Sequence, residues 1–501
     1  MSSDSVSAPP LSSPDNLDRR RAGLLLHLTS LPGAGPNGDL GWEAHNFVNF
    51  AADCGFTLWQ MLPVGPPQGS LSPYQTSSAH AGWSHLIGLE PLVQDGWLEA
   101  LPEAPYDAAA KTRALHQAHA GFLARAGGDE RRALDELHAR HAYWLDDYAL
   151  YRAIHEERNA PWWQWPKALR ERESRALAQA RKRLAAQIEY LVWEQFVFFR
   201  QWDALHAHAA ERGVLLFGDM PIFVAHDSAE VWARPEDFDL TDTGETRTVA
   251  GVPPDYFSAT GQRWGNPLYR WDRLAASDYR FWVDRMRTQL TLFDVVRIDH
   301  FRGFEAFWEV PASEPTAMHG RWVPADGDAL FARLEREFGR LPLVAEDLGV
   351  ITEAVTALRR KYGMPGMTIL QFAFDGGPKN PYLPFHHDRD AVVYTGTHDN
   401  DTTLGWYESL SDAERAGVDD YLGLPGEPMP WPLNRAALAS TANLAVLPMQ
   451  DVLGLDTTHR MNIPGTPEGN WAWRFTWDQV TPELPARLTH LVQLYGRAPT
   501  D

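Results

Sequence analysis

The segment VVRIDH places two charged side chains two positions apart. Side chains alternate between the faces of a strand, so Arg297 and Asp299 share one face while Val296 and Ile298 take the other. The guanidinium would keep the carboxylate ionised, and a nucleophilic carboxylate must be ionised. A buried structural ion pair is the alternative, and this segment alone does not decide between the two.

A second acidic pair lies in LVAEDLG, where Glu346 and Asp347 are adjacent. Neighbouring residues of a strand point in different directions, so only one of the two carboxyls can face a shared pocket. A carboxyl in a largely apolar setting has a raised pKa and can stay protonated as a general acid. The other carboxyl would accept hydrogen bonds at a helix N-cap or in a loop. The pattern leaves open which residue takes which role.

Further acidic residues follow two other apolar runs: Asp219 in FGDMPIF, and Asp399 beside His398 in YTGTHDND. Like charges gathered in one pocket are costly unless they are paired or functional. Two chemistries use such a cluster: coordination of a hard metal ion, and glycosidic-bond chemistry with a nucleophile or base and an acid. Rings in nearby loop-like sequence could stack on pyranose faces and favour a sugar over a metal: Tyr74, Tyr256, Phe257 and Trp264.

Eight short apolar runs recur along the chain with helical segments between them. Such runs are typical of parallel strands buried on both faces, and eight of them predict a (β/α)8 barrel; a doubly wound open sheet is the alternative. In a barrel the carboxyl ends of the strands converge on one face, which would bring the acidic strand ends together. The runs are 23–28, 57–64, 214–224, 294–299, 342–347, 367–374, 391–399 and 443–453.

The segments outside the barrel also have a distinct composition. Residues 1–22 contain too few apolar side chains to fold, so we expect them to form a flexible tail. The catalytic barrel is expected over residues 23–501. Residues 85–213 are too long for one crossover, and their pattern predicts an inserted helical subdomain whose last helix ends at Gly213. Its aromatic residues are expected in helix packing: Trp193, Phe196, Phe199 and Trp202. The Gly-, Pro- and aromatic-rich stretch 251–271 suits an ordered loop over a site.

Charge and composition exclude several classes of protein. The formal charge of −21 would repel a nucleic-acid backbone or an anionic membrane. The only cysteine, Cys54, cannot form an intrachain disulfide and is expected to be buried. No signal-peptide core or membrane-spanning run is present, so we expect a soluble, cytoplasmic protein. The usual phosphate-loop, dinucleotide, serine-hydrolase and zinc-protease motifs are absent.

From about Gly23 to its C-terminus the chain resembles the 4-α-glucanotransferases of the amylomaltase type, glycoside hydrolase family 77. This resemblance implies a (β/α)8 TIM barrel with inserted subdomains and a retaining double displacement without metal or cofactor. It implies α-1,4-glucans, maltooligosaccharides and glucose as partners, and we expect a monomer. The segments that carry it are HLTSLPG, SPYQTSSA, GDMPIFVAHDSAEVW, GVPPDYFSATGQRWGNPLYRW, VVRIDHFRGF, AEDLGVIT, GMTILQFAF, TGTHDNDTTLGWY and RMNIPGTPEGNWAWR.

The resemblance also implies roles for individual residues. The family's nucleophile falls on Asp299, its acid/base on Glu346 and its transition-state-stabilising carboxylate on Asp399. The resemblance further suggests Arg297 and His398 as supporting contacts, Tyr74 as a stacking residue beside the bond to be cleaved, and Asp219 in the first conserved barrel segment. The 251–271 stretch resembles the family's active-site lid, which would offer four residues to the glucan: Tyr256, Phe257, Gln262 and Trp264.

The chain departs from the family after SPYQTSSA, where a phenylalanine and then an Asn-Pro are usual. The residues present there are His80, Trp83, Ser84, His85 and Gly88, near an expected glucan contact, so chain-length preference is not implied. Two rival functions share the same residues: an α-amylase-like hydrolase, in which water replaces the acceptor sugar, and a glucan-binding protein without activity.

Overall fold

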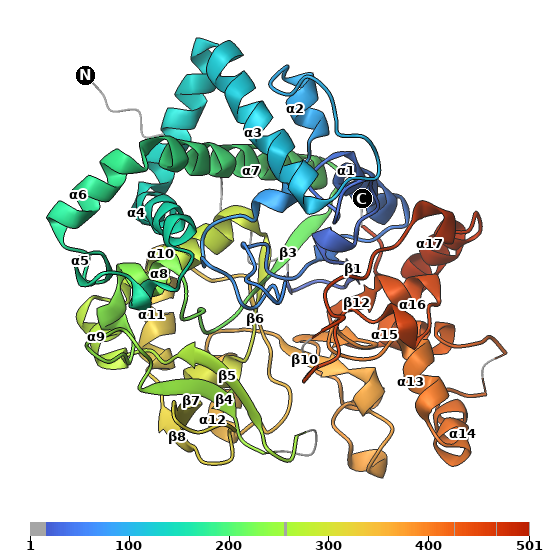
Figure 1. The fold of residues 1–501 in the computed structure, drawn as a ribbon. Helices are drawn as coiled ribbons and strands as arrows, with labels where there is room; N and C mark the ends of the chain where they lie inside the picture. Colours follow the sequence, from blue (N-terminus) through green and yellow to red (C-terminus); the bar gives the residue numbers. More distant parts are fainter. Residues whose placement is uncertain (1–16, 255–257, 425, 467, 500–501) are drawn as a thin grey trace.

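The computed structural model describes residues 17–254, 258–424, 426–466 and 468–499. Its centre is an eight-stranded parallel sheet (Figure 1). The hydrogen-bonded order of its strands is β10-β11-β12-β1-β2-β3-β6-β9. Each predicted apolar run overlaps one strand. The strands are β1 (Arg21–Leu25), β2 (Leu58–Gln60), β3 (Leu215–Met220), β6 (Val295–Ile298), β9 (Leu343–Ala345), β10 (Gly366–Ile369), β11 (Ala391–Tyr394) and β12 (Leu444–Pro448).

The sheet curls into a nearly closed barrel. Its two end strands, β9 and β10, share no ladder in the described part of the chain. The amide of Ala345 donates to the carbonyl of Pro365, just before β10, at 2.9 Å and brings the end strands together. The predicted barrel is confirmed, and the open doubly wound sheet is excluded.

Alternate side chains of each strand enter two separate cores. Inside the barrel lie Leu25, Leu58, Phe217, Val295 and Val392, among others. Their chain neighbours pack outward against the helices: Leu24, Trp59, Leu216, Val296 and Val393. Burial on both faces explains why the strands read as continuous apolar runs. The first strand starts at Arg21, and Leu17 is 3% exposed, so the fold includes residues before the predicted boundary at Gly23.

Helices fill the stretch between β2 and β3. Trp193, Phe196, Phe199 and Trp202 are buried there, as predicted, and Gly213 has the left-handed φ of 71° expected after a helix end. The last two helices of this stretch, α6 and α7, are separated at Leu184. The helices are α2 (Glu90–Gln94), α3 (Ala108–Arg125), α4 (Gly128–Arg158), α5 (Lys167–Arg170), α6 (Ser174–Arg183) and α7 (Ala185–Glu211).

The remaining helices cover the outside of the barrel and its rim (Figure 1). Among the described residues no helix is long and apolar enough to span a membrane. Cys54 is buried, as predicted. These helices are α1 (Trp42–Asp53), α8 (Ala229–Ala233), α9 (Trp271–Ala276), α10 (Arg280–Leu292), α11 (Gly327–Phe338), α12 (Glu353–Lys361), α13 (Thr403–Ser409), α14 (Asp412–Tyr421), α15 (Trp431–Ala439), α16 (Met449–Leu453) and α17 (Leu484–Leu494).

A second, antiparallel sheet with strand order β5-β4-β7-β8 was not predicted. Its strands are β4 (Thr248–Val252), β5 (Gln262–Pro267), β7 (Ala306–Pro311) and β8 (Arg321–Pro324). Parts of 251–271, expected as a loop, are therefore strand. The pairing of β4 with β7, which follows the barrel strand β6, joins distant segments, so local composition did not reveal it.

Arg497 is buried near the C-terminus, and the described residues include no acidic partner for it. Its side chain is fully buried and donates to five backbone carbonyls at 2.7 to 2.9 Å: Leu438, Arg21, Asn443, Ser440 and Ala442. Burial lowers the pKa of this guanidinium to about 9, so the five carbonyl dipoles are what stabilise its charge. The residue joins β1, the end of α15 and the C-terminal segment.

We expect Arg497→Met to lower the free energy of unfolding by about 4 kcal/mol, because it leaves several buried carbonyls without donors. Urea unfolding followed by tryptophan fluorescence measures this loss. The matched control is Arg132→Met, which breaks an exposed ion pair with Asp129 and should cost no more than about 0.5 kcal/mol. Equal losses in the two variants would contradict the role given to Arg497.

Candidate active site

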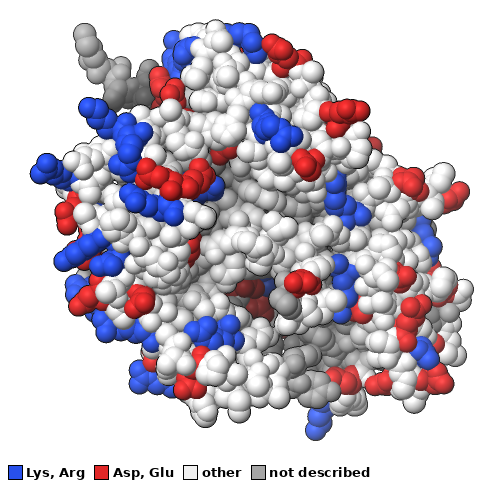
Figure 2. Space-filling view, in the orientation of Figure 1, with Lys and Arg blue, Asp and Glu red and all other residues white. Residues whose placement is uncertain are grey.

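The acidic residues singled out from the sequence gather at the carboxyl ends of the barrel strands. Asp219 lies within β3, Asp299 directly follows β6, and Glu346 directly follows β9. His398 and Asp399 lie on the turn after β11. Figure 2 shows this face of the molecule hollowed near its centre, with acidic side chains inside the hollow. Several strand ends therefore contribute charged groups to one concave surface.

Arg297 holds two of the carboxylates. Its Nη1 donates to both oxygens of Asp219 at 2.8 and 2.7 Å, and its Nη2 donates to Oδ1 of Asp299 at 2.7 Å. Burial alone would lower the pKa of Arg297, but the charges of Asp219 and Asp299 raise it, so the guanidinium stays charged. The Asp219 side chain is 1% exposed and that of Asp299 is 31% exposed. Asp219 is therefore a buried anchor, whereas Asp299 can meet a ligand.

Glu346, not Asp347, faces the site. Its Oε2 accepts from the amide of His300 at 2.8 Å, and its Oε1 accepts from the amide of Leu348 at 2.9 Å. Asp347 turns away and pairs with Arg359 at 3.0 Å. Burial, reinforced by the charge of Asp299, raises the pKa of Glu346 to about 7. Its environment therefore suits a carboxyl that gives and takes a proton near neutral pH.

His300 contributes both its backbone amide and its ring to the site. His300 has a φ of 51°, in the left-handed region that non-glycine residues rarely adopt. His300 directly follows Asp299, and its amide donates to Oε2 of Glu346. The His300 ring meets Trp264 of β5 edge to face, with 4.8 Å between centroids. The second sheet thus reaches the acidic cluster through Trp264, and the Trp264 Nε1 in turn donates to Gln262 at 3.1 Å.

Tyr74 joins the cluster from the loop after β2. Its hydroxyl donates to Oδ2 of Asp219 at 2.7 Å and lies 2.9 Å from Nε2 of His398. Burial and the charge of Asp219 raise the pKa of this phenol well above its usual value, so it remains a donor. The rings of Tyr74 and His398 are stacked with centroids 5.4 Å apart, and His398 Nε2 lies 3.4 Å from Asp399 Oδ2. The chain of contacts therefore runs from Arg297 to Asp399.

The structure brings together most residues named from the sequence. Tyr256 and Phe257 lie outside the described residues, so the expected lid over 251–271 is described only on either side of them. Sequence reasoning missed three residues from the C-terminal part that approach the site: Arg460, Asn462 and Trp471. They lie in RMNIPGTPEGNWAWR, which carries no strand or helix periodicity, so only the resemblance signalled that segment.

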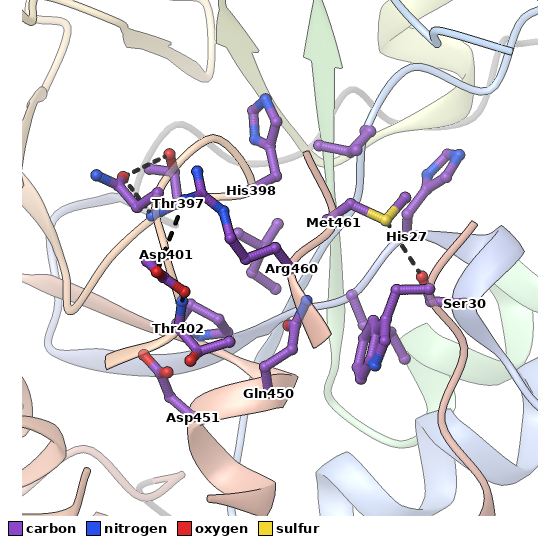
Figure 3. Close-up of a pocket in the computed structure, with 16 residues that line it drawn as sticks. His27, Ser30, Thr397, His398, Asp401, Thr402, Gln450, Asp451, Arg460 and Met461 are labelled. Carbon is purple, nitrogen blue, oxygen red and sulfur yellow. Dashed lines mark hydrogen bonds and ion pairs between the residues drawn. The ribbon is translucent and has the colours of Figure 1, made fainter. Parts of the chain in front are cut away.

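A pocket beside His398 opens between the ends of β1, β11 and β12 (Figure 3). It is lined by His27 and Ser30 from the β1 side, and by Asp401, Arg460 and Met461, among others. Burial lowers the pKa of His27 to about 3, so its ring is neutral. The site thus continues past His398 along the rim of the barrel.

The residues that depart from the family pattern make their own contacts. His80 is 6% exposed, stacks on Trp144 and lies 2.8 Å, Nδ1 to Oγ1, from Thr288 of α10. Trp83 stacks on His85 with centroids 5.4 Å apart, and Ser84 begins a short 3-10 helix. A Cβ at Gly88 would lie 2.6 Å from the Cα of Gly41, so the close approach of these segments requires glycine.

A parallel barrel whose rim carries an arginine-held carboxylate and a second, buried carboxyl defines a barrel enzyme of the glycoside-processing class. The profile of glycoside hydrolase family 77, described as 4-alpha-glucanotransferase, matches residues 26–480. The chain belongs to this family and is an enzyme with 4-alpha-glucanotransferase activity. The resemblance deduced from the sequence motifs is confirmed, and a glucan-binding protein without activity is excluded.

Individual relatives agree over the whole chain. The 4-alpha-glucanotransferase of Thermus thermophilus is 50% identical over 495 residues, which cover 95% of this chain and 99% of the relative. That of Synechocystis sp. is 47% identical, over 96% of this chain and 99% of the relative. The solved amylomaltase of Streptococcus agalactiae in complex with acarbose superimposes with a TM-score of 0.92 at 36% identity, covering 96% of this chain and 100% of that one.

Proposed function

We propose that the enzyme transfers α-1,4-glucan segments by a retaining double displacement. Asp299 attacks the anomeric carbon of the donor while Glu346 protonates the glycosidic oxygen of the leaving glucan, giving a covalent glycosyl-enzyme. Glu346, now ionised, then takes the proton from the 4-hydroxyl of an acceptor sugar, whose oxygen displaces Asp299. The supporting observation is the contrast between an arginine-held, partly exposed carboxylate and a buried carboxyl with a pKa of about 7.

The other groups of the cluster serve the sugar at the point of cleavage. Asp399 binds its hydroxyls, and these contacts strengthen as the ring flattens towards an oxocarbenium ion. Tyr74 and His398 support Asp399 and offer further hydrogen bonds, while Arg297 orients Asp299 through a direct hydrogen bond. Asp219 acts through Arg297 and Tyr74 rather than on the substrate, because its oxygens are already occupied and buried.

The substrates are maltooligosaccharides and longer α-1,4-glucans as donors, and glucose or another glucan as acceptor. The relative from Streptococcus agalactiae, solved in complex with acarbose, supports this substrate class. Trp264 and Gln262 approach the cluster from the side of His300, opposite Asp399 in the chain of contacts, and we assign them to the acceptor. Asp299 forms the covalent bond and Glu346 transfers both protons in the proposed mechanism, so its steps use no cofactor.

Incubation of the purified protein with maltotriose alone, resolved by chain length over time, tests this function. A ladder of longer maltooligosaccharides with accumulating glucose is the expected result. Glucose and maltose alone, with nothing longer than the trimer, would make water the acceptor. The covalent step is tested separately with a fluorinated maltosyl donor whose glycosyl-enzyme is deglycosylated slowly. The trapped sugar should be found by mass spectrometry on the peptide that carries Asp299.

The raised pKa of Glu346 predicts the alkaline side of the pH profile. Protonation of the leaving group requires the acid form of Glu346, and this form is lost as pH rises through about 7. We expect kcat/KM for maltotriose to fall about tenfold per pH unit above that point. The intrinsic fluorescence of the protein, measured at each pH, controls for unfolding. A flat profile from pH 7 to 9 would contradict the assignment of the proton to Glu346.

A further inference from the structure

A short C-terminal segment, residues 460–462, contacts both the side chain and the backbone of Asp399. The side-chain amide of Asn462 donates to Oδ1 of Asp399 at 2.6 Å. The Nη2 of Arg460 donates to the backbone carbonyl of Asp399 at 3.0 Å, and its Nε donates to the carbonyl of Asn462 at 3.2 Å. Arg460 therefore connects the backbone of Asp399 to the backbone of Asn462, whose side chain binds the Asp399 carboxylate.

Asp399 needs outside support because no regular element positions it. It lies on a turn five residues beyond Tyr394, where β11 ends, and its side chain is 47% exposed. Its contacts within the turn are long: its amide lies 3.4 Å from Oγ1 of Thr397, and its Oδ2 lies 3.4 Å from His398. By contrast, Asp299 and Glu346 directly follow barrel strands and have contacts of 2.7 to 2.9 Å.

The segment that contains Arg460 and Asn462 is itself attached to the barrel. Asn462 is 9% exposed and Met461 is 5% exposed. The Met461 carbonyl accepts from the amide of Trp471 at 2.8 Å, and its sulfur accepts from the Ser30 hydroxyl at 3.7 Å. Figure 3 shows Arg460 extending from the Met461 side of the pocket towards Asp401, whose carboxylate lies 3.7 Å away. Because this segment is buried and hydrogen-bonded, it restrains Asp399, which it contacts.

We propose that Asn462 and Arg460 are positioning residues that hold the carboxylate of Asp399 in the orientation required for transfer. Asn462 occupies Oδ1, so Oδ2 is left towards His398 and the sugar. Arg460 fixes the distance between the two segments. The proposal rests on the role given to Asp399 under the proposed function. Contacts that strengthen in the transition state are sensitive to small displacements, so losing this support should lower kcat rather than raise KM.

Steady-state kinetics of Asn462→Ala and Arg460→Gln test the proposal. We expect each to lower kcat for transfer from maltotriose by about 10- to 100-fold, with KM within about threefold of its original value. Arg460→Lys should recover part of the loss, because an ammonium can still donate to one carbonyl. The control is Thr466→Ala, which removes a hydrogen bond to Ile463 within the same segment but touches nothing on Asp399. It should change kcat by less than about twofold.

Asn462→Asp provides a readout that a purely structural role would not move. At acid pH the introduced carboxyl keeps its proton and can still donate to Asp399, whereas at neutral pH its charge repels Asp399. The activity relative to the unaltered enzyme should therefore rise as pH falls from 7 to 5, while the relative activity of Asn462→Ala stays constant. Parallel profiles for the two variants would overturn the proposal.

A double-mutant cycle completes the test with α-maltosyl fluoride as donor. In an Asp399→Asn background, Asn462→Ala should cause little further loss of kcat, because it acts through Asp399. A full, additive loss, or a raised KM with unchanged kcat, would instead make Asn462 a direct substrate contact and overturn the proposal. If the unaltered protein extends no maltotriose, the proposed function fails; if it does and Asn462→Ala matches it, only the positioning role fails.

Discussion

Replacement of Glu346 by glutamine should lower kcat for glucan transfer roughly 10³-fold and leave glucan binding largely intact. The amide keeps the size of the carboxyl and its carbonyl oxygen can still accept from the amide of His300 or of Leu348. It cannot release a proton to the leaving oxygen. Turnover of maltotriose and binding of a long maltooligosaccharide by calorimetry, measured on the same preparation, separate the two effects.

Asp347→Asn is the matched control for that variant, because it makes the same chemical change one residue away. Asp347 accepts from the amide of Met367 at 2.8 Å and pairs with Arg359, and neither contact reaches the acidic cluster. The asparagine can keep the first of these contacts. We expect kcat to fall less than about threefold, with some loss of stability. Persistent transfer in Glu346→Gln would show that the proton comes from elsewhere.

Arg297→Met should both inactivate and destabilise the protein. The side chain of Asp219 is 1% exposed and takes two hydrogen bonds from Arg297, so the variant leaves a buried carboxylate with Tyr74 as its remaining close donor. Breaking a buried pair by removing one partner costs about 3–5 kcal/mol. Asp299 loses its charged neighbour as well, so we expect kcat to fall at least about 10³-fold. Urea unfolding and maltotriose transfer measure the two losses.

Adding Asp219→Asn to Arg297→Met separates stability from activity. The neutral amide removes the uncompensated buried charge, so most of the lost stability should return, while activity should not. A single variant as stable as the unaltered protein would mean that water or a rearranged side chain already compensates Asp219. Recovery of activity in the double variant would mean that Arg297 matters only as the partner of Asp219, and the role assigned to its contact with Asp299 would be wrong.

The predictable part of the fold came from local signals. The eight strands were found because burial on both faces makes each of them a continuous apolar run. The pairing of Arg297 with Asp299 followed from the two-residue period of a strand. Strand ends were predicted too late, by up to five residues after β10, β11 and β12, because the apolar runs continue into buried turns and into α16. Burial alone does not mark where a ladder stops.

The rest depends on partners that are distant in the chain. The residue facing the site, Glu346 or Asp347, is decided by Arg359 on α12 and by the backbone of His300, and neither shows in the local pattern. Asn462 reaches Asp399 across 63 positions from a segment without periodicity. The second sheet needs β7 to pair with β4. The resemblance to a family supplied the catalytic assignments, but not these contacts.

The weak contact between β9 and β10 should determine where the barrel first opens on heating. Two hydrogen bonds connect the strands there. The amide of Ala345 donates to the Pro365 carbonyl, and the amide of Met367 donates to the Asp347 carboxylate, which replaces a backbone carbonyl as acceptor. Because few hydrogen bonds connect β9 and β10, heating should separate these two strands first. Glu346 directly follows β9. Warming should therefore disturb this proposed proton donor before the rest of the barrel unfolds, and turnover should fail at a lower temperature than the fold.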